Sequence, residues 1–462
     1  MQEALRFAES MFKRVSVRKK SGREASAGER CVRGAVPSAE AVVQRAVGFE
    51  IEKGAYRFFR SPEHYHEMTA ALWDGYILSE EEIHGSVRFR KGDILLEGDG
   101  FTVQADISVK ERWPYMEIVT DPFEETPEGY AKLTATMAKL TRMMARVKRE
   151  PGYIWLSNLK EFGALRSEHK EAVMKTRGSE EAYFQVTAGL GLDKLGRLFD
   201  DLGYPDEEET EAERERKAGG RSTFIPPNKS VDPLFRYRSQ LMVREVDRTV
   251  RRLADRAPML KDPQLMGLLR VVGMYLMFGS QEVGHYPKSF VPVLARTDVA
   301  TMFEKLPRPL KATLRNYKAN LWRAVVDDLC GLLGIGGLSA RFFARGVYQY
   351  HTNLAMRNML GKDLTRDDWV SNLPFGKDLL TEKHYPDRHR AYLFRAMGGM
   401  GAHMDKDSDK TGAPVFEFRK INKDVPFSEW QSFGQSVFKY IYALNRGEDK
   451  AFGEDVEISS TK

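Results

Sequence analysis

Residues 47–52 read Val-Gly-Phe-Glu-Ile-Glu. The apolar Val47, Phe49 and Ile51 alternate with Gly48, Glu50 and Glu52. Successive side chains of a β-strand point to opposite faces, so the stretch predicts a strand with Glu50 and Glu52 on one face and apolar side chains on the other. Such a strand packs its apolar face against a core. The stretch therefore predicts a half-buried antiparallel sheet whose second face carries carboxylates.

The same alternation occurs in four further segments, at residues 101–109, 115–120, 183–190 and 416–419. Solvated polar faces are common on antiparallel sheets, but this one repeats carboxylates at strand centres. Two glutamates at positions i and i+2 repel each other, and a cation between them makes the arrangement tolerable. The side chains expected on this polar face are Glu50, Glu52, Gln104, Asp106, Glu117, Gln185, Thr187, Glu417 and Arg419.

Outside these strands the sequence is largely helical. Apolar residues recur at helical spacing over residues 128–148, 233–345 and 430–445. Because strands and helices are segregated rather than alternating, this order predicts an α+β fold instead of a doubly wound one. We expect an antiparallel catalytic sheet that helices cover on one face, together with a large helical insertion.

We expect three parts along the chain. Residues 1–40 form a basic N-terminal arm, residues 41–445 a single catalytic domain with a mostly helical insertion at about 205–345, and residues 446–462 a flexible tail. Residues 1–34 carry nine Lys and Arg against four Glu, which supplies +5 of the formal net charge of +6. The remainder is near neutral, so we do not expect the domain itself to bind nucleic acid.

Composition narrows the class of protein. The chain is 42% hydrophobic and 30% charged, which is typical of a globular protein. Its two cysteines, Cys31 and Cys330, cannot build a disulfide framework or a four-cysteine zinc site. No apolar run approaches the ~20 residues of a membrane span, and the first thirty residues lack an apolar secretory core. We expect a cytoplasmic protein, or one delivered into another cell's cytosol by a route without a sequence trace.

Carboxylates that converge on one face are suitable ligands for Mg²⁺, which prefers hard oxygen atoms supplemented by water and substrate phosphates. An arginine beside them would neutralise charge on a transferring phosphoryl group. The chain contains no Gly-x-x-x-x-Gly-Lys-Ser/Thr sequence, so a P-loop is not expected. The pattern favours an ATP- and Mg²⁺-dependent site of another kind.

The order of four short motifs resembles the glutamine synthetase / glutamate–cysteine ligase superfamily, and most closely its amidoligase-like branch. These motifs are Phe49-Glu-Ile-Glu52, Asp106-Ile-Ser108, Met116-Glu-Ile-Val119 and Phe416-Glu-Phe-Arg419. The resemblance covers residues 45–125, 180–195 and 412–445, less than half of the chain. It implies a glutamine-synthetase-like sheet and a carboxylate–amine ligase. ATP would phosphorylate a carboxylate, and an amine would displace phosphate to leave an amide or isopeptide bond.

The resemblance also implies roles for individual residues. Glu52 and Arg419 would act in catalysis, with Arg419 also binding the transferring phosphate, and Asp106 would orient the amine or another substrate group. The substrate could be a protein or peptide side chain, as in the actin-crosslinking toxin domains of this superfamily. The residues implied as metal ligands are Glu50, Glu52, Glu117 and Glu417.

Two features fall outside the family's pattern. The amidoligase branch carries His-x-His on its central strand, whereas this chain has Gln185-Val-Thr187, so a nucleotide contact there would use an amide and a hydroxyl. Residues 284–298 place Lys288 and Arg296 in a connecting loop that could close over substrate phosphates, with ordinary surface residues as the alternative. Arg296 is the preferred catalytic candidate, because a guanidinium fork matches phosphate or carboxylate.

Two other functions remain open from the sequence. A non-enzymatic protein would use the basic arm and the helical region to bind nucleic acid or an acidic partner, and that binding would be salt-sensitive and lost without residues 1–34. A metal-dependent hydrolase would use the same acidic face without ATP. A binding protein offers no reason for carboxylates to gather on one face, so we rank it below the ligase.

Overall fold

The computed structural model describes residues 45–73, 89–107, 114–176, 180–202, 233–279, 293–297, 299–315, 321–338, 413–418, 425–450 and 454–459. They fall into two compact units. The sheet unit contains the described residues of 45–188 and 417–459, and the helical unit those of 189–202 and 233–416. The predicted basic arm, Lys288 and Arg419 lie outside the described residues.

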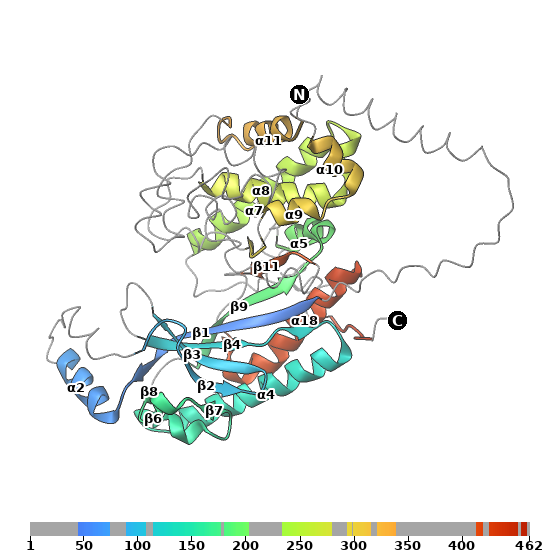
Figure 1. Ribbon diagram of the computed structural model, residues 1–462. Coiled ribbons are helices and arrows are strands. Elements are labelled where there is room, and N and C mark those ends of the chain that lie inside the picture. Colours follow the sequence, from blue (N-terminus) through green and yellow to red (C-terminus); the bar gives the residue numbers. More distant parts are fainter. Residues whose placement is uncertain are drawn as a thin grey trace, which may run out of the picture. The chain divides into compact units, whose positions relative to one another are not determined.

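Antiparallel pairing dominates the sheet unit (Figure 1). Its central strand β1 pairs with β4 on one side and β9 on the other. The strand order is β11-β9-β1-β4-β3-β2-β7, and β11 contributes its last two residues to this unit. The strands are β1 (Ala46–Phe59), β2 (Ile94–Gly98), β3 (Phe101–Ile107), β4 (Pro114–Thr120), β7 (Ala164–Leu165), β9 (Glu181–Gly189) and β11 (Val415–Phe418).

Shorter elements complete the sheet unit. Strand β5 pairs with β1, β8 pairs with β1 and β6, and β12 pairs with β9. These elements are α2 (Pro62–Trp73), β5 (Phe123–Glu124), β6 (Tyr153–Trp155), η1 (Leu156–Leu159), η2 (Ser167–His169), β8 (Val173–Lys175), β12 (Val425–Pro426) and η8 (Phe427–Glu429).

Helix α4 (Pro127–Lys148) begins where the sequence provides a strong start signal. Thr126 caps it, accepting a hydrogen bond from the Gly129 N–H at 3.1 Å, and proline occupies the first turn, where a missing N–H costs nothing. Gly129 lies against β5, because a Cβ there would approach the Glu124 carbonyl oxygen to 1.9 Å. The helix buries an apolar stripe that consists of Leu133, Met137, Leu140, Met143, Met144 and Val147.

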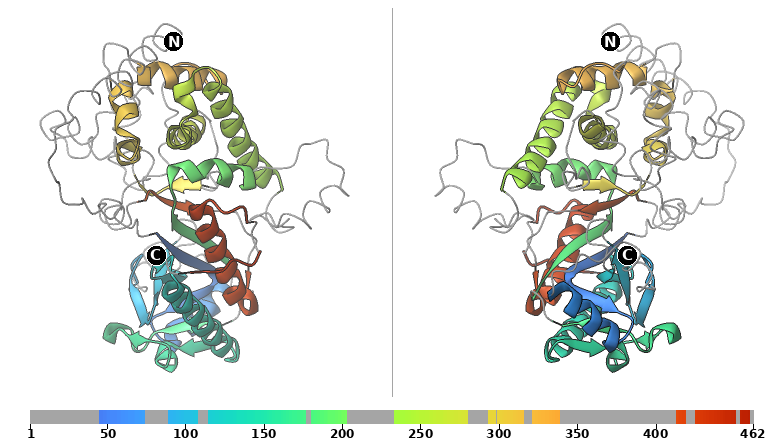
Figure 2. Two further views of the ribbon diagram at one scale, coloured as in Figure 1. Left: turned by 90° about the vertical axis from the view of Figure 1, so that its right-hand side faces the viewer. Right: turned by 90° about the vertical axis from the view of Figure 1, so that its left-hand side faces the viewer.

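Helix α18 (Trp430–Arg446) packs beside α4, and it ends at Gly447, whose φ of 72° suits a left-handed cap. Trp430 lies edge-on to Phe184 of β9 with ring centroids 5.5 Å apart, and Phe184 in turn contacts Phe49 of β1 at 6.2 Å. Figure 2 shows α4 and α18 on one side of the sheet in both of its views. The apolar face of the predicted strands is therefore the face that these helices cover.

The helical unit is built mainly from helices, with η3 against α8. A Cβ at Gly267 of α8 would approach the Leu192 carbonyl oxygen to 1.9 Å, so a glycine is needed where α8 meets η3. Its elements are η3 (Leu192–Lys194), α5 (Leu195–Leu202), α7 (Pro233–Ala254), η4 (Pro258–Lys261), α8 (Pro263–Gly279), β10 (Val293–Ala295), α9 (Val299–Glu304), α10 (Arg308–Leu314) and α11 (Leu321–Leu332).

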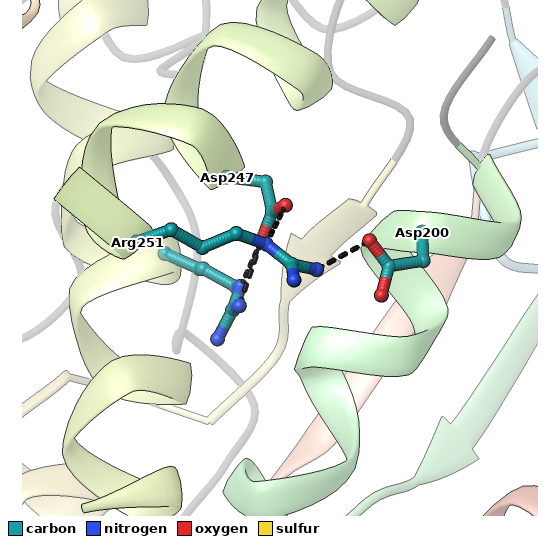
Figure 3. A network of polar contacts seen from close by, with 4 residues as sticks. Asp200, Asp247 and Arg251 are labelled. Carbon is teal, nitrogen blue, oxygen red and sulfur yellow. Dashed lines mark hydrogen bonds and ion pairs between the residues drawn. The ribbon is translucent and has the colours of Figure 1, made fainter. Parts of the chain in front are cut away.

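One ion-pair network ties three helices of this unit together (Figure 3). Asp247 of α7 accepts hydrogen bonds from Arg270 of α8 and from Arg251 of its own helix, each at 2.7 Å. Arg251 also pairs with Asp200 of α5. Arg270 is only 3% exposed, so its charge depends on Asp247 for compensation.

The predicted α+β class is confirmed: the protein combines antiparallel strands with segregated helices. Among the helices that the structure describes, none has both the length and the apolar composition of a membrane span.

Candidate active site

Strand register brings the predicted acidic residues to one face of the sheet unit. Glu52 of β1 lies directly opposite Glu117 of β4, and Gln104 of β3 lies opposite Glu117 on its other side. On the other flank of β1, Gln185 of β9 lies opposite Glu50. Directly opposed residues share a face, so these five side chains form one acidic face across β3, β4, β1 and β9.

Burial follows the predicted parity of β1. Phe49 and Ile51 are fully buried under the helices, whereas Glu50 and Glu52 are half-buried on the opposite face. Glu117 is also half-buried, between the buried Met116 and Ile118. The alternation that predicted the strand therefore also predicts which face carries the carboxylates.

Each of the two central carboxylates receives a hydrogen bond from a glutamine amide. Gln104 Nε2 donates to Glu117 Oε2 at 3.0 Å. Gln185 Nε2 donates to Glu52 Oε1. The amide oxygen of Gln185 is buried and has no hydrogen-bond partner within the described part of the chain.

Asp106 occupies a second, more enclosed position on this face. It is 5% exposed, its Oδ2 accepts a hydrogen bond from the Tyr115 hydroxyl, and its Oδ1 pairs with the Lys91 ammonium. Burial, followed by that hydrogen bond to Asp106 and the charge of Glu52, raises the pKa of Tyr115 above its usual value. Tyr115 therefore stays protonated and available as a donor to Asp106.

Glu117 lies among the other carboxylates of the acidic face. Burial raises the pKa of Glu117 to about 7, assisted by the charges of Glu50, Asp106 and Glu52 and opposed by Lys91. Near neutral pH this carboxyl group is balanced between its two protonation states. A bound cation would favour the ionised form, because opposite charge stabilises a carboxylate.

The chemistry of these donors fits Mg²⁺. Among the described residues no three His, Cys, Asp or Glu side chains stand close enough together to hold a metal ion. Mg²⁺, however, commonly takes one or two protein carboxylates and completes its shell with water and substrate phosphates. The opposed pair Glu52 and Glu117 meets that smaller requirement, and the buried, unpaired amide oxygen of Gln185 adds a further hard acceptor beside it.

The remaining predicted residues are less closely grouped. Glu417 of β11 is fully buried, and Thr187 of β9 is half-buried opposite Gly48. Arg296 is half-buried in the helical unit, where its backbone N–H donates to the Val415 carbonyl oxygen at 2.7 Å. The roles predicted for Arg419 and Lys288 lie outside the described residues.

A separate hollow of about 490 Å³ lies in the sheet unit, between the end of β1 and η2. Arg60, Phe89, His169 and Lys170 are among its lining residues, and Phe89 contacts His169 with ring centroids 5.2 Å apart. None of the lining residues is one of the predicted site residues. This hollow is therefore distinct from the acidic face.

Sequence reasoning missed two participants in the site. Tyr115 was not singled out, although its position two residues before Glu117 places it on the same face of β4. Lys91 precedes β2 in a turn, and its contact with Asp106 depends on tertiary structure that no local pattern records.

Comparison with known proteins adds little to this geometry. No family model matches the chain, and no curated protein matches its sequence. A solved structure described as that of "a Vibrio cholerae toxin from the MARTX/VgrG family" aligns with a TM-score of 0.29 and 10% identity, covering 64% of this chain and 85% of that one. A TM-score and an identity this low do not establish a shared fold or a shared activity.

Proposed function

We propose that this protein is an ATP- and Mg²⁺-dependent carboxylate–amine ligase with a glutamine-synthetase-like sheet. The observation that carries the proposal is the opposed pair Glu52 and Glu117, held at the centre of an antiparallel sheet with Glu50 and Asp106 on the same face. Such crowding of carboxylates is unfavourable, and a divalent cation would add to the counter-charge that Lys91 supplies at Asp106.

In the proposed reaction the acidic face positions two substrates. Mg²⁺ held by the opposed pair Glu52 and Glu117, with water and phosphate oxygens completing its shell, would neutralise the phosphates of ATP. The other two predicted ligands, Glu50 and Glu417, do not join this pair in a group of three. The substrate carboxylate attacks the γ-phosphorus, ADP leaves, and the resulting acyl phosphate is attacked by an amine that expels phosphate and loses a proton. Arg419 would stabilise the transferring phosphoryl group, with Gln185 and Thr187 near the nucleotide.

Asp106 supports the amine half of this proposal. It is a buried carboxylate that accepts an ammonium group, that of Lys91, on one oxygen and the Tyr115 hydroxyl on the other. A carboxylate in this arrangement suits a primary amine as the second substrate. In its narrower form, the proposal takes a lysine side chain of a protein or peptide as the amine substrate. In that form the protein acts inside another cell's cytosol.

The test is release of ADP and phosphate on mixing the protein with Mg²⁺, ATP and paired carboxylate and amine substrates. Glu52→Gln keeps the side-chain shape and removes the charge, and we expect turnover to fall by about tenfold or more. Glu97→Gln is the matched control, because Glu97 lies in the same sheet, on β2, in an exposed ion pair with Arg166 at 2.8 Å. Full turnover by Glu52→Gln would contradict the proposal, and turnover without ATP would indicate a hydrolase.

A further inference from the structure

Two glutamines flank the central carboxylate pair in a matched arrangement. In the strand order β3-β4-β1-β9, Glu117 and Glu52 occupy the two inner strands, and Gln104 and Gln185 the two outer ones. Each glutamine donates to the carboxylate on the strand next to it, Gln104 at 3.0 Å from Glu117 and Gln185 to Glu52. Gln104 stands directly opposite Glu117, whereas Gln185 stands opposite Glu50 and reaches Glu52 diagonally, so each central carboxylate receives one amide.

The environment of Gln185 points to a ligand rather than to packing alone. Gln185 is 3% exposed, and its amide oxygen has no hydrogen-bond partner among the described residues. An ionised carboxylate only accepts hydrogen bonds, so the amide nitrogen donates to Glu52 and the amide oxygen is left for a donor other than Glu52. Leaving a buried carbonyl oxygen unpaired is unfavourable unless a water or ligand donates to it.

We propose that Gln104 and Gln185 are positioning residues that orient Glu117 and Glu52 toward one divalent cation bound between β4 and β1. Each amide fixes the rotation of its carboxylate by holding one oxygen, and the Gln185 oxygen accepts a hydrogen bond from water in the cation's shell. The inference rests on the proposed function only in that the cation is the same Mg²⁺.

The experiment measures Mg²⁺ binding to the full chain by titration calorimetry without nucleotide. Gln104→Met and Gln185→Met keep the side-chain length and remove the amide, and we expect each to weaken the dissociation constant for Mg²⁺ by about 10- to 100-fold. Gln435→Met is the matched control. Gln435 of α18 donates to Thr134 Oγ1 at 3.1 Å in the same unit, on the helix-covered side of the sheet. Its loss should leave Mg²⁺ affinity unchanged.

Circular dichroism and thermal unfolding separate positioning from folding. A merely structural role would lower the unfolding midpoint without changing Mg²⁺ affinity, whereas a positioning role changes affinity in a folded variant. Gln104→Asn and Gln185→Asn form a second series that stays polar but is one methylene too short to reach its carboxylate, and these variants should weaken binding as well.

The outcomes separate this inference from the ligase proposal. Unchanged Mg²⁺ affinity in all four glutamine variants would overturn the inference, even if the wild type turns over ATP. Weakened affinity in the variants supports it even if the wild type fails to turn over ATP, a result that counts against the ligase proposal alone. A wild type that binds no Mg²⁺ overturns this inference directly.

Discussion

At the scale of single residues, two carboxyl groups of the sheet unit, those of Glu117 and Glu125, have raised pKa values in different surroundings. Glu117 is crowded by other carboxylates, and its pKa is raised to about 7. Glu125 lies at the junction of β5 and α4, where burial raises its pKa to about 8 against the opposing effects of its hydrogen bond with Asn445 and the charges of Arg45 and Arg446. Burial is thus the largest cause of the raised pKa of both residues, but only Glu117 belongs to the acidic face.

The raised pKa of Glu125 predicts a pH-dependent stability. The folded protein holds this proton more tightly than the unfolded chain, whose glutamate titrates near the ordinary value of 4.5. Its contribution to stability is therefore fully present below pH 4.5 and is lost as the pH rises toward 8, at up to about 1.4 kcal/mol per pH unit.

Asn445 Nδ2 donates a hydrogen bond to Glu125 Oε1 at 2.6 Å. Glu125→Gln tests the pH dependence, because Gln keeps an oxygen that can accept this hydrogen bond and has no proton to lose. We expect the unfolding free energy of the variant, measured by urea titration, to increase relative to that of the wild type as the pH rises from 4.5 to 8. A constant difference between the two proteins over that range would contradict the assignment.

At the scale of elements, close approaches of backbone decide where the helices can lie. Gly129 in the first turn of α4 allows the helix to contact β5, since a Cβ there would come within 1.9 Å of the Glu124 carbonyl oxygen. Backbone atoms cannot move aside as a flexible side chain can. The position of α4 over the apolar face of the sheet thus depends on a residue without a side chain.

Gly129→Ala should therefore destabilise the protein by roughly 2 kcal/mol or more, measured as a lower unfolding free energy in urea. The matched substitution is Gly331→Ala in α11, where a Cβ would meet nothing within 4 Å. There alanine should stabilise by about 0.5–1 kcal/mol, because it reduces the freedom of the unfolded chain and favours helix. Equal effects at the two sites would show that the close approach at Gly129 does not exist.

Strand elements were the most predictable part of the fold. Period-two alternation identified β1, β3, β4, β9 and β11, since a strand's parity is a local property. Burial follows the predicted parity in β1 and β4, whereas Gln185 of β9 and Glu417 of β11 are buried like their apolar neighbours. The contacts of Lys91 with Asp106 and of Gln185 with Glu52 were not predictable, because they depend on which strands become neighbours. The predicted roles of Lys288 and Arg419 fall outside the described residues and stay predictions.

At the scale of the whole molecule, the described residues form two units with different kinds of polar contact. The sheet unit gathers carboxylates on one face, whereas the helical unit pairs its buried charges, Arg270 with Asp247. The exposed Arg251 joins this pair to Asp200. A fully compensated network of this kind fixes how helices meet and needs no ligand. The candidate chemistry therefore belongs to the sheet unit.

Asp247→Asn should destabilise the helical unit by about 3–5 kcal/mol, because it leaves the buried charge of Arg270 without compensation. Glu245→Gln on the same helix is the matched control: Glu245 pairs with Arg248 at 3.4 Å in an exposed position, and its loss should cost about 1 kcal/mol or less. Urea unfolding followed by circular dichroism measures both, and similar losses would contradict the role given to Asp247.

The contact between Lys91 and Asp106 has a consequence for selectivity in the proposed reaction. The Lys91 side chain is 70% exposed and tethered beside a carboxylate that is 7% exposed, so it acts as a built-in competitor for any incoming amine. Tethering gives such a group an effective concentration on the order of millimolar, which dilute free ammonia would not match. An amine presented by a larger substrate, held by contacts elsewhere, can displace it. Replacement of Lys91 by a lysine of the substrate at Asp106 would then favour amines of macromolecules over small amines.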